Sequence, residues 1–433
     1  MPQSVIYKAR FSIKSVLYKK HCVSLLHNKN YINMEITDAY INSTRLVNSV
    51  SMAHIRYLYD TIDWSSRMVC IKGARGVGKT TMMLQRMKQL FPKSEQAIYV
   101  SLDDLWFTEH RLIDLAEYHF LHGGTHLFVD EVHRYPYNNW IQELKNIYDR
   151  YPELHIVFTG SSLLQIDFSL ADLSRRCVFY TLQGLSFREY LRFEEKGEFA
   201  ALTLDRILKE HISITTDIVS QTTIIPLFEE YLRHGYYPFY KEAPASYSLR
   251  LQQVITTILE NDLPAVEKVE YVSIKKMKRL LMIVSQMVPF SPNMTKVGES
   301  IETTRQAVSR MFQLLERAAL LIMLYSEKNN MQQLTKPEKV YLENTNLMYA
   351  LAPTSDIGNI RETFFANQLK ANHTITFSGQ GDFRIDDTYT FEVGGKTKSF
   401  EQIKDIPNSY LAIDNVEYGT GKRIPLWLFG FLY

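Results

Sequence analysis

Four short apolar runs rich in β-branched and aromatic residues alternate with helical patterns in the first half of the chain. The runs are Met68–Lys72, Gln96–Leu102, His126–Asp130 and His155–Ser162, and the helical patterns between them cover residues 81–90, 114–121 and 139–151. Strands that alternate with helices of about ten residues are typical of a parallel sheet with helices on its faces. The pattern therefore predicts an α/β fold.

Apolar positions at helical spacing continue through residues 212–263, which predicts a helical lid. Three further helical patterns cover residues 275–288, 294–300 and 303–318, and the apolar residues 319–325 follow them as an expected strand. Three helices followed by a strand hairpin make a winged helix. We therefore expect a winged-helix domain after the lid.

The last hundred residues mix helical and strand patterns. They predict a helix over residues 359–369, strands over 374–378, 383–385 and 388–393, a helix near 400–404 and a strand over 409–413. This order of elements predicts a second α/β domain.

Composition narrows the class of protein. Hydrophobic residues make up 45% and charged residues 22% of the 433 residues, and the formal net charge of +2 gives no global attraction to nucleic acid. The longest apolar run, residues 318–325, is far shorter than the roughly 20 residues of a membrane span. Three cysteines without a CxxC pair fit a reducing compartment. We expect a cytoplasmic protein with no membrane partner.

Residues 1–33 contain six Lys or Arg residues and no Asp or Glu, and a second methionine follows at Met34. This pattern favours an upstream extension ahead of a chain that starts at Met34, over a flexible basic tail or a transit peptide.

A glycine-rich loop between an expected strand and an expected helix is the first candidate for chemistry. It consists of Gly73, Ala74, Arg75, Gly76, Val77, Gly78, Lys79 and Thr80, with Thr81 next. Glycines let backbone N–H groups turn inward around a phosphate, and the helix N-terminus adds the positive end of its dipole. Lys79 would reach the β- and γ-phosphates of a nucleotide, and the Thr80 hydroxyl would bind Mg²⁺.

An acidic pair should accompany this loop, since the Mg²⁺ needs a carboxylate and the attacking water needs a base. Asp130 ends an apolar run and is placed for the Mg²⁺ shell, while Glu131 is placed to orient or deprotonate water. The strand end at Thr159 and Ser161 could sense the γ-phosphate or position the water. The extra strand between the loop and the acidic pair indicates the P-loop branch with a catalytic Glu beside the Mg²⁺-binding Asp.

Together these motifs resemble the AAA+ ATPases, and residues 173–176 and 183–191 look like one prokaryotic, archaeal-type branch of them. Residues 235–238 and 261–264 are also similar to segments of that branch, so the resemblance covers roughly residues 43–433. It implies ATP and Mg²⁺ as ligands and a C-terminal domain of unknown function similar to restriction endonucleases. It also implies an arginine finger, for which Arg175 and Arg176 are the candidates.

The expected architecture therefore has five parts. They are an N-terminal extension and lead-in over residues 1–42, the ATPase domain over 43–195, the lid over 196–270, the winged helix over 271–335 and the nuclease-like domain over 336–433. The third helix of the winged helix carries residues suited to DNA, namely Arg305, Ser309, Arg310 and Gln313, but also Glu316. We favour a protein partner over DNA at this helix and leave homo-oligomer formation open.

Nucleases of the type that the resemblance implies place a helix Glu, a strand Asp and an E-x-K strand around Mg²⁺. Glu362, Asp382, Glu392 and Lys396 match this set, except that Lys396 stands four residues after Glu392 instead of two. A bulge at Gly394–Gly395 could bring Lys396 or Lys398 back. We expect a degenerate nuclease fold used for contacts, with an active nuclease as the alternative.

The sequence thus predicts an ATPase that hydrolyses ATP with Mg²⁺ and thereby moves its winged helix and C-terminal domain. Two alternatives stay open. One is a nucleotide-gated switch with slow hydrolysis that controls a signalling or defence partner, and the other is an ATP-regulated DNA nuclease.

Overall fold

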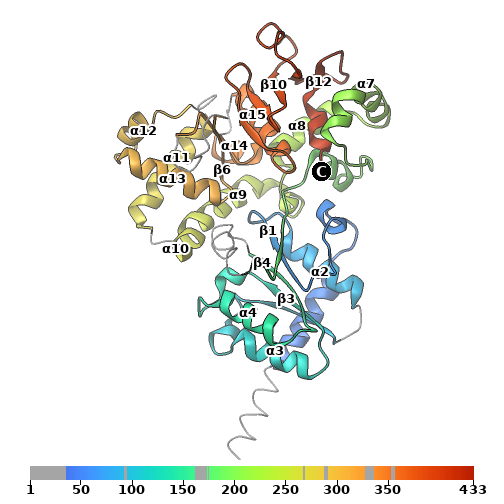
Figure 1. Cartoon of the computed structure of the whole chain (residues 1–433), viewed down its shortest axis with the longest axis vertical. Helices are drawn as coiled ribbons and strands as arrows, with labels where there is room; N and C mark the ends of the chain where they lie inside the picture. Colours follow the sequence, from blue (N-terminus) through green and yellow to red (C-terminus); the bar gives the residue numbers. More distant parts are fainter. Residues whose placement is uncertain are drawn as a thin grey trace, which may run out of the picture. The chain divides into compact units, whose positions relative to one another are not determined.

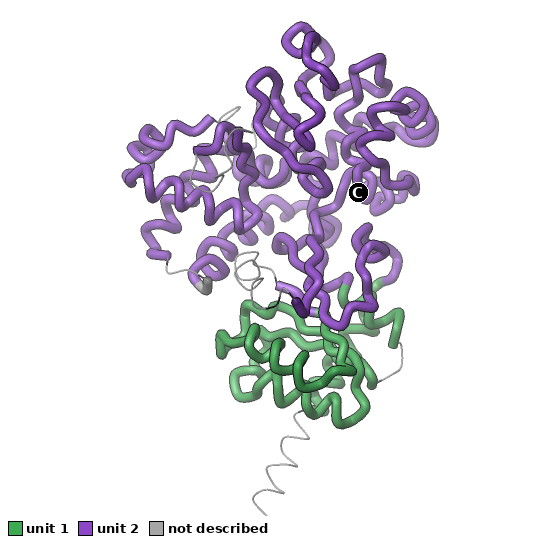
Figure 2. Tube along the Cα trace, viewed as in Figure 1, with its two compact units in different colours: residues 1–51, 83–157 green, residues 52–82, 158–433 purple. Residues whose placement is uncertain are grey.

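The computed structural model describes residues 36–91, 95–160, 173, 175–266, 269–286, 291–326, 336–352 and 356–433. The proposed extension over residues 1–33 and the candidate Ser161 lie outside these described residues. The chain forms two compact units, one of residues 1–51 and 83–157 and one of residues 52–82 and 158–433 (Figure 2).

The first unit alternates strands and helices, as its apolar pattern predicts. A helix over residues 36–49 comes first, and the later elements are β2 (Ala97–Ser101), η2 (Leu105–Thr108), α3 (Leu112–Leu121), β3 (His126–Asp130), η3 (Val132–Arg134) and α4 (Trp140–Arg150). Strand β2 pairs with β3 in parallel, so that Ser101 lies opposite Asp130 at the carboxyl ends of both strands. Helices α3 and α4 pack against each other (Figure 1).

Two elements, α2 (Lys79–Leu90) and β4 (His155–Gly160), continue from one unit into the other. The first strand of the chain, β1 (Met68–Lys72), pairs in parallel with β5 (Val178–Thr181), which the sequence analysis did not anticipate. The strand order of this five-stranded sheet is β2-β3-β4-β1-β5. A parallel α/β sheet with an extra strand between the loop and the acidic pair is therefore confirmed.

Helices dominate the next part of the second unit. They are η1 (Tyr57–Asp60), α6 (Phe187–Phe193), α7 (Leu204–Gln221), α8 (Ile224–His234), η4 (Pro238–Lys241), η5 (Pro244–Ser246), α9 (Tyr247–Thr257), the π-helical turn η6 (Ile258–Asp262) and α10 (Leu263–Val266). Helices α11 (Tyr271–Gln286), α12 (Met294–Ser300) and α13 (Arg305–Arg317) follow, and β6 (Leu321–Leu324) pairs antiparallel with β7 (Lys339–Leu342). Three helices and a two-stranded sheet thus occur in the expected order, while the winged helix itself stays a prediction.

The C-terminal part of the second unit contains α14 (Thr345–Leu351), α15 (Ile357–Leu369), β8 (Ile375–Phe377), β9 (Phe383–Ile385), β10 (Tyr389–Gly394), β11 (Ser409–Ile413), β12 (Arg423–Pro425) and η8 (Leu426–Phe431). The strand order of its sheet is β12-β11-β10-β9-β8. Strands β10, β11 and β12 are parallel, whereas β8, β9 and β10 are antiparallel.

The helix expected near residues 400–404 is wrong, because residues 401–405 form turns instead. The backbone N–H groups of Ile403 and Ile406 donate to carbonyls three residues earlier, and the apolar side chains have the same three-residue spacing. Phe400, Ile403 and Ile406 thereby pack together against Leu411 and Ile413. Burial of this cluster, rather than helix propensity, determines the local backbone conformation.

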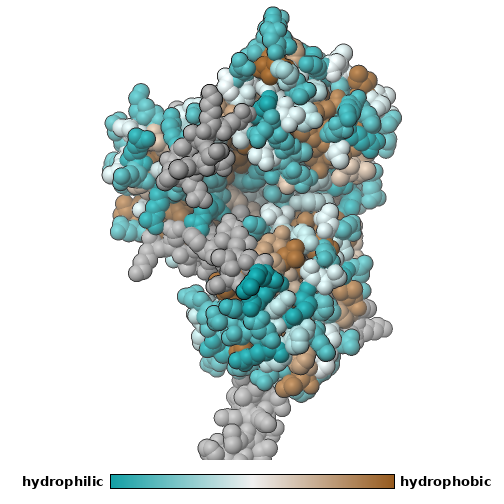
Figure 3. Space-filling view, in the orientation of Figure 1, coloured by the Kyte–Doolittle hydropathy of each residue, from teal (hydrophilic) through white to brown (hydrophobic). Residues whose placement is uncertain are grey.

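Among the described residues, no helix is both long and apolar enough to span a membrane. Figure 3 shows a largely hydrophilic face on which the hydrophobic residues are scattered.

A buried ion pair lies beside the glycine-rich loop of the second unit. The Arg56 guanidinium contacts the Glu189 carboxylate at 3.0 Å, and their side chains are 6% and 2% exposed. Arg56 also donates to the carbonyl oxygens of Val77, Gln183 and Gly184. Burial alone would raise the pKa of Glu189, but Arg56, the Tyr57 backbone N–H and Arg188 together outweigh it, so the pKa of this carboxyl lies below its ordinary value.

We predict that Glu189→Gln lowers the free energy of unfolding by about 3–5 kcal/mol, because it leaves Arg56 buried without its counter-charge. Urea denaturation near neutral pH measures this change. Since the pKa of Glu189 is lowered by folding, its stabilisation is present above the ordinary carboxyl pKa and is lost as the pH falls through the lowered value. The difference in the free energy of unfolding between wild type and variant should therefore become smaller below about pH 4.

The matched control is Asp205→Asn, which removes the exposed ion pair between Asp205 and Lys209 on α7. This variant should unfold almost as the wild type does. Equal losses in the two variants would contradict a special role for the buried pair.

Candidate functional site

The glycine-rich loop joins the buried strand β1 to helix α2. Gly76 and Gly78 have φ angles of +87° and +98°, which only glycine adopts without strain. Lys79 is the first residue of α2 and is 5% exposed. Its ammonium group donates to the carbonyl oxygens of Gly73 and Ala74, both at 2.9 Å. The lysine is thus held over the loop, as a phosphate-binding lysine must be.

Residues of η4 cover one side of this loop. A Cβ atom built on Gly76 would lie 2.7 Å from the Phe239 ring and 3.6 Å from the Tyr237 ring. A Cβ atom built on Gly78 would lie 3.9 Å from both Pro238 and Arg56. The loop therefore lies against an aromatic wall that permits only glycine at position 76.

An ion pair ties the same loop to the π-helical turn. The Arg75 guanidinium lies 3.6 Å from the carboxylate of Asp262, which is 1% exposed. Tyr237 and Asp262 lie in segments 235–238 and 261–264, and Phe239 directly follows the first of these segments. The sequence pattern drew attention to these segments but not to the roles of Phe239 and Asp262, because nothing in the sequence shows that they approach the loop.

In the first unit, Asp130 lies at the end of β3 and is 2% exposed. One carboxylate oxygen accepts from the Tyr99 hydroxyl and the other from the Glu131 backbone N–H, both at 3.0 Å. Burial, with the charge of Asp130, raises the pKa of Tyr99 far above its ordinary value, so the hydroxyl stays protonated and donates. These two hydrogen bonds hold the Asp130 carboxylate in place at the end of the strand.

The next residue, Glu131, has a left-handed backbone with a φ angle of +51°. Such a conformation costs of order 1–3 kcal/mol in a residue other than glycine, and it turns the side chain away from the strand. The Glu131 carboxylate lies 3.4 Å from Nε2 of His133, whose side chain is completely buried. The sequence analysis missed His133, although its position two residues after Glu131 was a signal.

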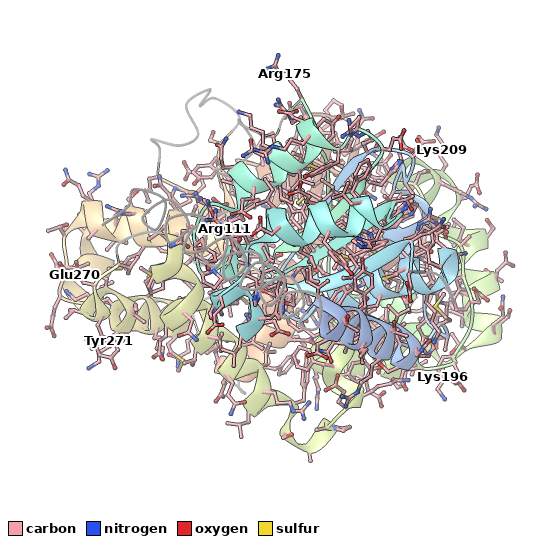
Figure 4. All side chains as sticks on the ribbon, turned by 90° about the horizontal axis from the view of Figure 1, so that it is seen from below. Arg111, Arg175, Lys196, Lys209, Glu270 and Tyr271 are labelled. Carbon is pink, nitrogen blue, oxygen red and sulfur yellow. The ribbon has the colours of Figure 1, made fainter. Side chains whose placement is uncertain are left out.

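The other candidates of this region are less informative. Thr159 is fully buried in β4. The Arg175 side chain is exposed and extends away from the ribbon (Figure 4), and Arg176 is half-buried. Neither arginine is favoured as a finger by this arrangement, so that role stays a prediction.

In the C-terminal domain, three of the expected nuclease-site residues do come together. Lys339 of β7 bridges two of them, since its ammonium group lies 3.1 Å from Glu362 of α15 and 2.9 Å from Asp382. Glu392 of β10 pairs with Lys398. The sequence analysis missed Lys339, which precedes the domain's first helix.

Of the two lysines that a bulge could return to Glu392, Lys398 pairs with it and Lys396 does not. Strand β10 ends at Gly394, and the Lys398 backbone N–H donates to the Gly395 carbonyl at 2.9 Å. This turn returns the chain, so that the Lys398 side chain passes 2.7 Å from a Cβ built on Gly394. The Lys396 carbonyl accepts from Arg423 instead. Two adjacent glycines permit the reversal because no Cβ atom blocks it.

Burial and mutual repulsion set the protonation of this cluster. Burial, followed by the charge of Asp382, raises the pKa values of Glu362 and Glu392. Burial would lower the pKa of Lys339, but Glu362 and Asp382 outweigh it and raise the value on balance. The lysine is therefore charged.

Two family models match parts of this chain. Residues 65–191 match an AAA domain, and residues 225–357 match a domain of unknown function, DUF8612. No protein of curated function matches the chain. The AAA match covers β1, the loop, the acidic pair and all but the last two residues of α6.

Similar solved structures include the Walker-type ATPase PABY2304 of Pyrococcus abyssi, with 10% identity, coverage of 66% of this chain and 91% of that chain, and a TM-score of 0.33. The AMPPCP-bound DnaA of Aquifex aeolicus has 12% identity, coverage of 60% and 84%, and a TM-score of 0.24. PCH-2 of C. elegans has 15% identity, coverage of 67% and 68%, and a TM-score of 0.23. At these TM-scores the similarities carry no argument about function.

We predict that Gly76→Ala weakens ATP binding by more than ten-fold, whereas Gly123→Ala leaves it unchanged. Both glycines have φ angles near +90°, so alanine strains either backbone by about 1–2 kcal/mol. Only at Gly76 does the new Cβ atom also meet a ring, since nothing lies within 4 Å of a Cβ at Gly123. Fluorescence titration with a labelled ATP analogue measures the affinity, and equal losses would contradict the special geometry of the loop.

Proposed function

With residues 65–191 matched to the AAA domain family, we propose that this chain binds ATP with Mg²⁺ and hydrolyses it. The observation that carries the proposal is the geometry of the loop after β1. Its two glycines have positive φ angles, and the buried Lys79 lies over the loop at the first position of α2. This is the form that a phosphate-binding loop requires.

The residues present suit Mg²⁺. A hydroxyl at Thr80 and a buried carboxylate at Asp130 are hard oxygen ligands of the kind that Mg²⁺ prefers. A bound Mg²⁺ would neutralise charge on the β- and γ-phosphates. Lys79 binds the same phosphates, and Glu131 orients the attacking water and takes its proton.

His133 acts as a positioning residue for Glu131 in this proposal. Glu131 lies in a strained left-handed conformation, so its carboxylate has few alternative positions within reach of Nε2 of the buried imidazole. A base held at one place loses less entropy when it meets the water.

The aromatic wall and the Arg75–Asp262 pair connect the loop to the helices that follow η4. We infer that ATP binding moves Phe239 and Asp262 relative to the loop, because both contact it directly. Since η6 continues into α10 and packs on α9 and α11, such a movement is passed to the helices that precede β6 and β7. A protein partner of α11–α13 would sense it, and DNA at α13 is the alternative partner.

A nucleotide-gated switch with slow hydrolysis is the second candidate. It is favoured by the loop's own contacts, since Lys79 is held by two loop carbonyls and Phe239 covers Gly76. If these contacts must open before ATP enters and close after it leaves, nucleotide exchange rather than the hydrolysis step limits the rate of turnover.

We predict that Glu131→Gln lowers kcat for ATP hydrolysis by roughly 10²–10⁴-fold while ATP still binds, because only the base is lost. Lys79→Ala should instead weaken ATP binding by roughly 10–100-fold, through the loss of charge-assisted hydrogen bonds. Steady-state phosphate release and equilibrium titration measure the two effects. Wild type that binds ATP tightly yet barely turns over would favour the switch, and wild type that binds no ATP would refute both proposals.

His133→Phe should lower kcat roughly ten-fold with little change in KM, since it removes the group that faces Glu131 and leaves the phosphate site intact. His133→Gln retains an N–H donor and should keep most of the rate. The same steady-state assay tests both variants. If His133→Phe and His133→Gln lose rate equally, or if KM changes instead, the imidazole does not position Glu131.

A further inference from the structure

The carboxylates of Glu362, Asp382 and Glu392 lie close enough to repel one another electrostatically. Glu362 and Glu392 are 8% and 2% exposed, and both pKa values are raised by burial and by Asp382. Three negative charges this close need cations, since an unpaired buried carboxylate costs several kcal/mol. In the nucleases that this domain is expected to resemble, Mg²⁺ is that cation.

The protein itself supplies a cation in this position. The ammonium group of Lys339 lies between Glu362 and Asp382 at 3.1 and 2.9 Å, and its side chain is 9% exposed. Lys398 provides a second ammonium group to Glu392. The two lysines thus compensate two of the three carboxylates.

Other donors occupy further oxygens of this cluster. The Tyr341 hydroxyl donates to the same Glu362 oxygen as Lys339, at 2.6 Å, and the second Asp382 oxygen accepts from the Val393 backbone N–H at 2.9 Å. One oxygen of Glu392 is buried without a hydrogen-bond donor. Mg²⁺ is usually bound through one or two carboxylates together with waters, and here the Lys339 ammonium group lies between the two carboxylates that would serve. In the described parts of the chain, no group of three or more His, Cys, Asp or Glu side chains is arranged to hold a metal ion.

We infer that Lys339 is the permanent cation of this carboxylate cluster, so that the C-terminal domain takes no divalent metal there and does not cut nucleic acid. The cluster acts as a clamp instead. Lys339 and Tyr341 are alternate residues of β7, which pairs with β6, while Glu362 and Asp382 belong to the C-terminal α/β domain. The ion pairs therefore join the two-stranded sheet, and α11 and α13 that pack on it, to α15 and the β9–β10 hairpin.

Mn²⁺ binding tests this inference in the full-length, nucleotide-free protein. Electron paramagnetic resonance of free Mn²⁺ should detect no ion bound to the cluster in the wild type. Lys339→Met keeps the length of the side chain and removes its charge, so this variant should bind one Mn²⁺ that is lost again in Lys339→Met/Asp382→Asn. Lys404→Met, which removes an exposed lysine from the same domain, should gain none. Asp130→Asn controls for ions held at Asp130.

Stability provides a second measurement that does not depend on metal binding. Lys339→Met should lower Tm by several degrees, because it leaves buried carboxylates uncompensated. Lys339→Met/Glu362→Gln removes the charges of one ion pair together and should recover part of that loss. Lys404→Met should melt with the wild type.

Wild-type protein that binds Mn²⁺ and loses it in Asp382→Asn would overturn the inference. So would Mg²⁺-dependent cleavage of plasmid DNA by the wild type that Asp382→Asn abolishes. A folded Lys339→Met variant that gains no Mn²⁺ and loses no stability would show that Lys339 is not the cation of the cluster.

Discussion

The buried pair between Arg56 and Glu189 is the contact on which the geometry of the glycine-rich loop depends. One guanidinium group donates to the loop at Val77, to the chain after β5 at Gln183 and Gly184, and to Glu189 of α6. Because the guanidinium is planar and its donors point in fixed directions, these three segments can satisfy it in only one arrangement. Arg56 thereby gives the glycine-rich loop a rigid support from outside its own backbone. A loop that must present its N–H groups to phosphate needs such a support.

A second buried cation performs a related task far along the sequence. Lys339 joins β7 to Glu362 and Asp382, as Arg56 joins the loop to α6. In both places a desolvated charge is tolerated because every partner is close and fixed, and removing a single partner would leave an uncompensated ion. Ion pairs of this kind contribute little net stability compared with apolar packing, but they specify which segments meet.

Side-chain contacts connect the glycine-rich loop to η4 and η6. Phe239 and Asp262 contact the loop at adjacent residues, Gly76 and Arg75. Under the proposed function, phosphate binds to this loop, so both contacts would respond to the presence of ATP. This arrangement suits hydrolysis-driven movement and a slow switch equally well, and the two differ in the rate of opening rather than in the residues used.

The sequence by itself determined the elements whose signals are local. The glycine spacing and Lys79 predict a phosphate loop because phosphate binding needs particular residue types at particular positions, and the apolar runs predict β1 to β4 because buried strands need them. Only the tertiary structure decided which distant side chains meet. Arg56, Phe239, Asp262 and Lys339 carry no local signal, and Lys398 replaced Lys396 because a turn at two glycines reversed the chain. Such contacts follow from the packing of whole elements, where burial and charge compensation over hundreds of residues, rather than local propensity, select the final arrangement.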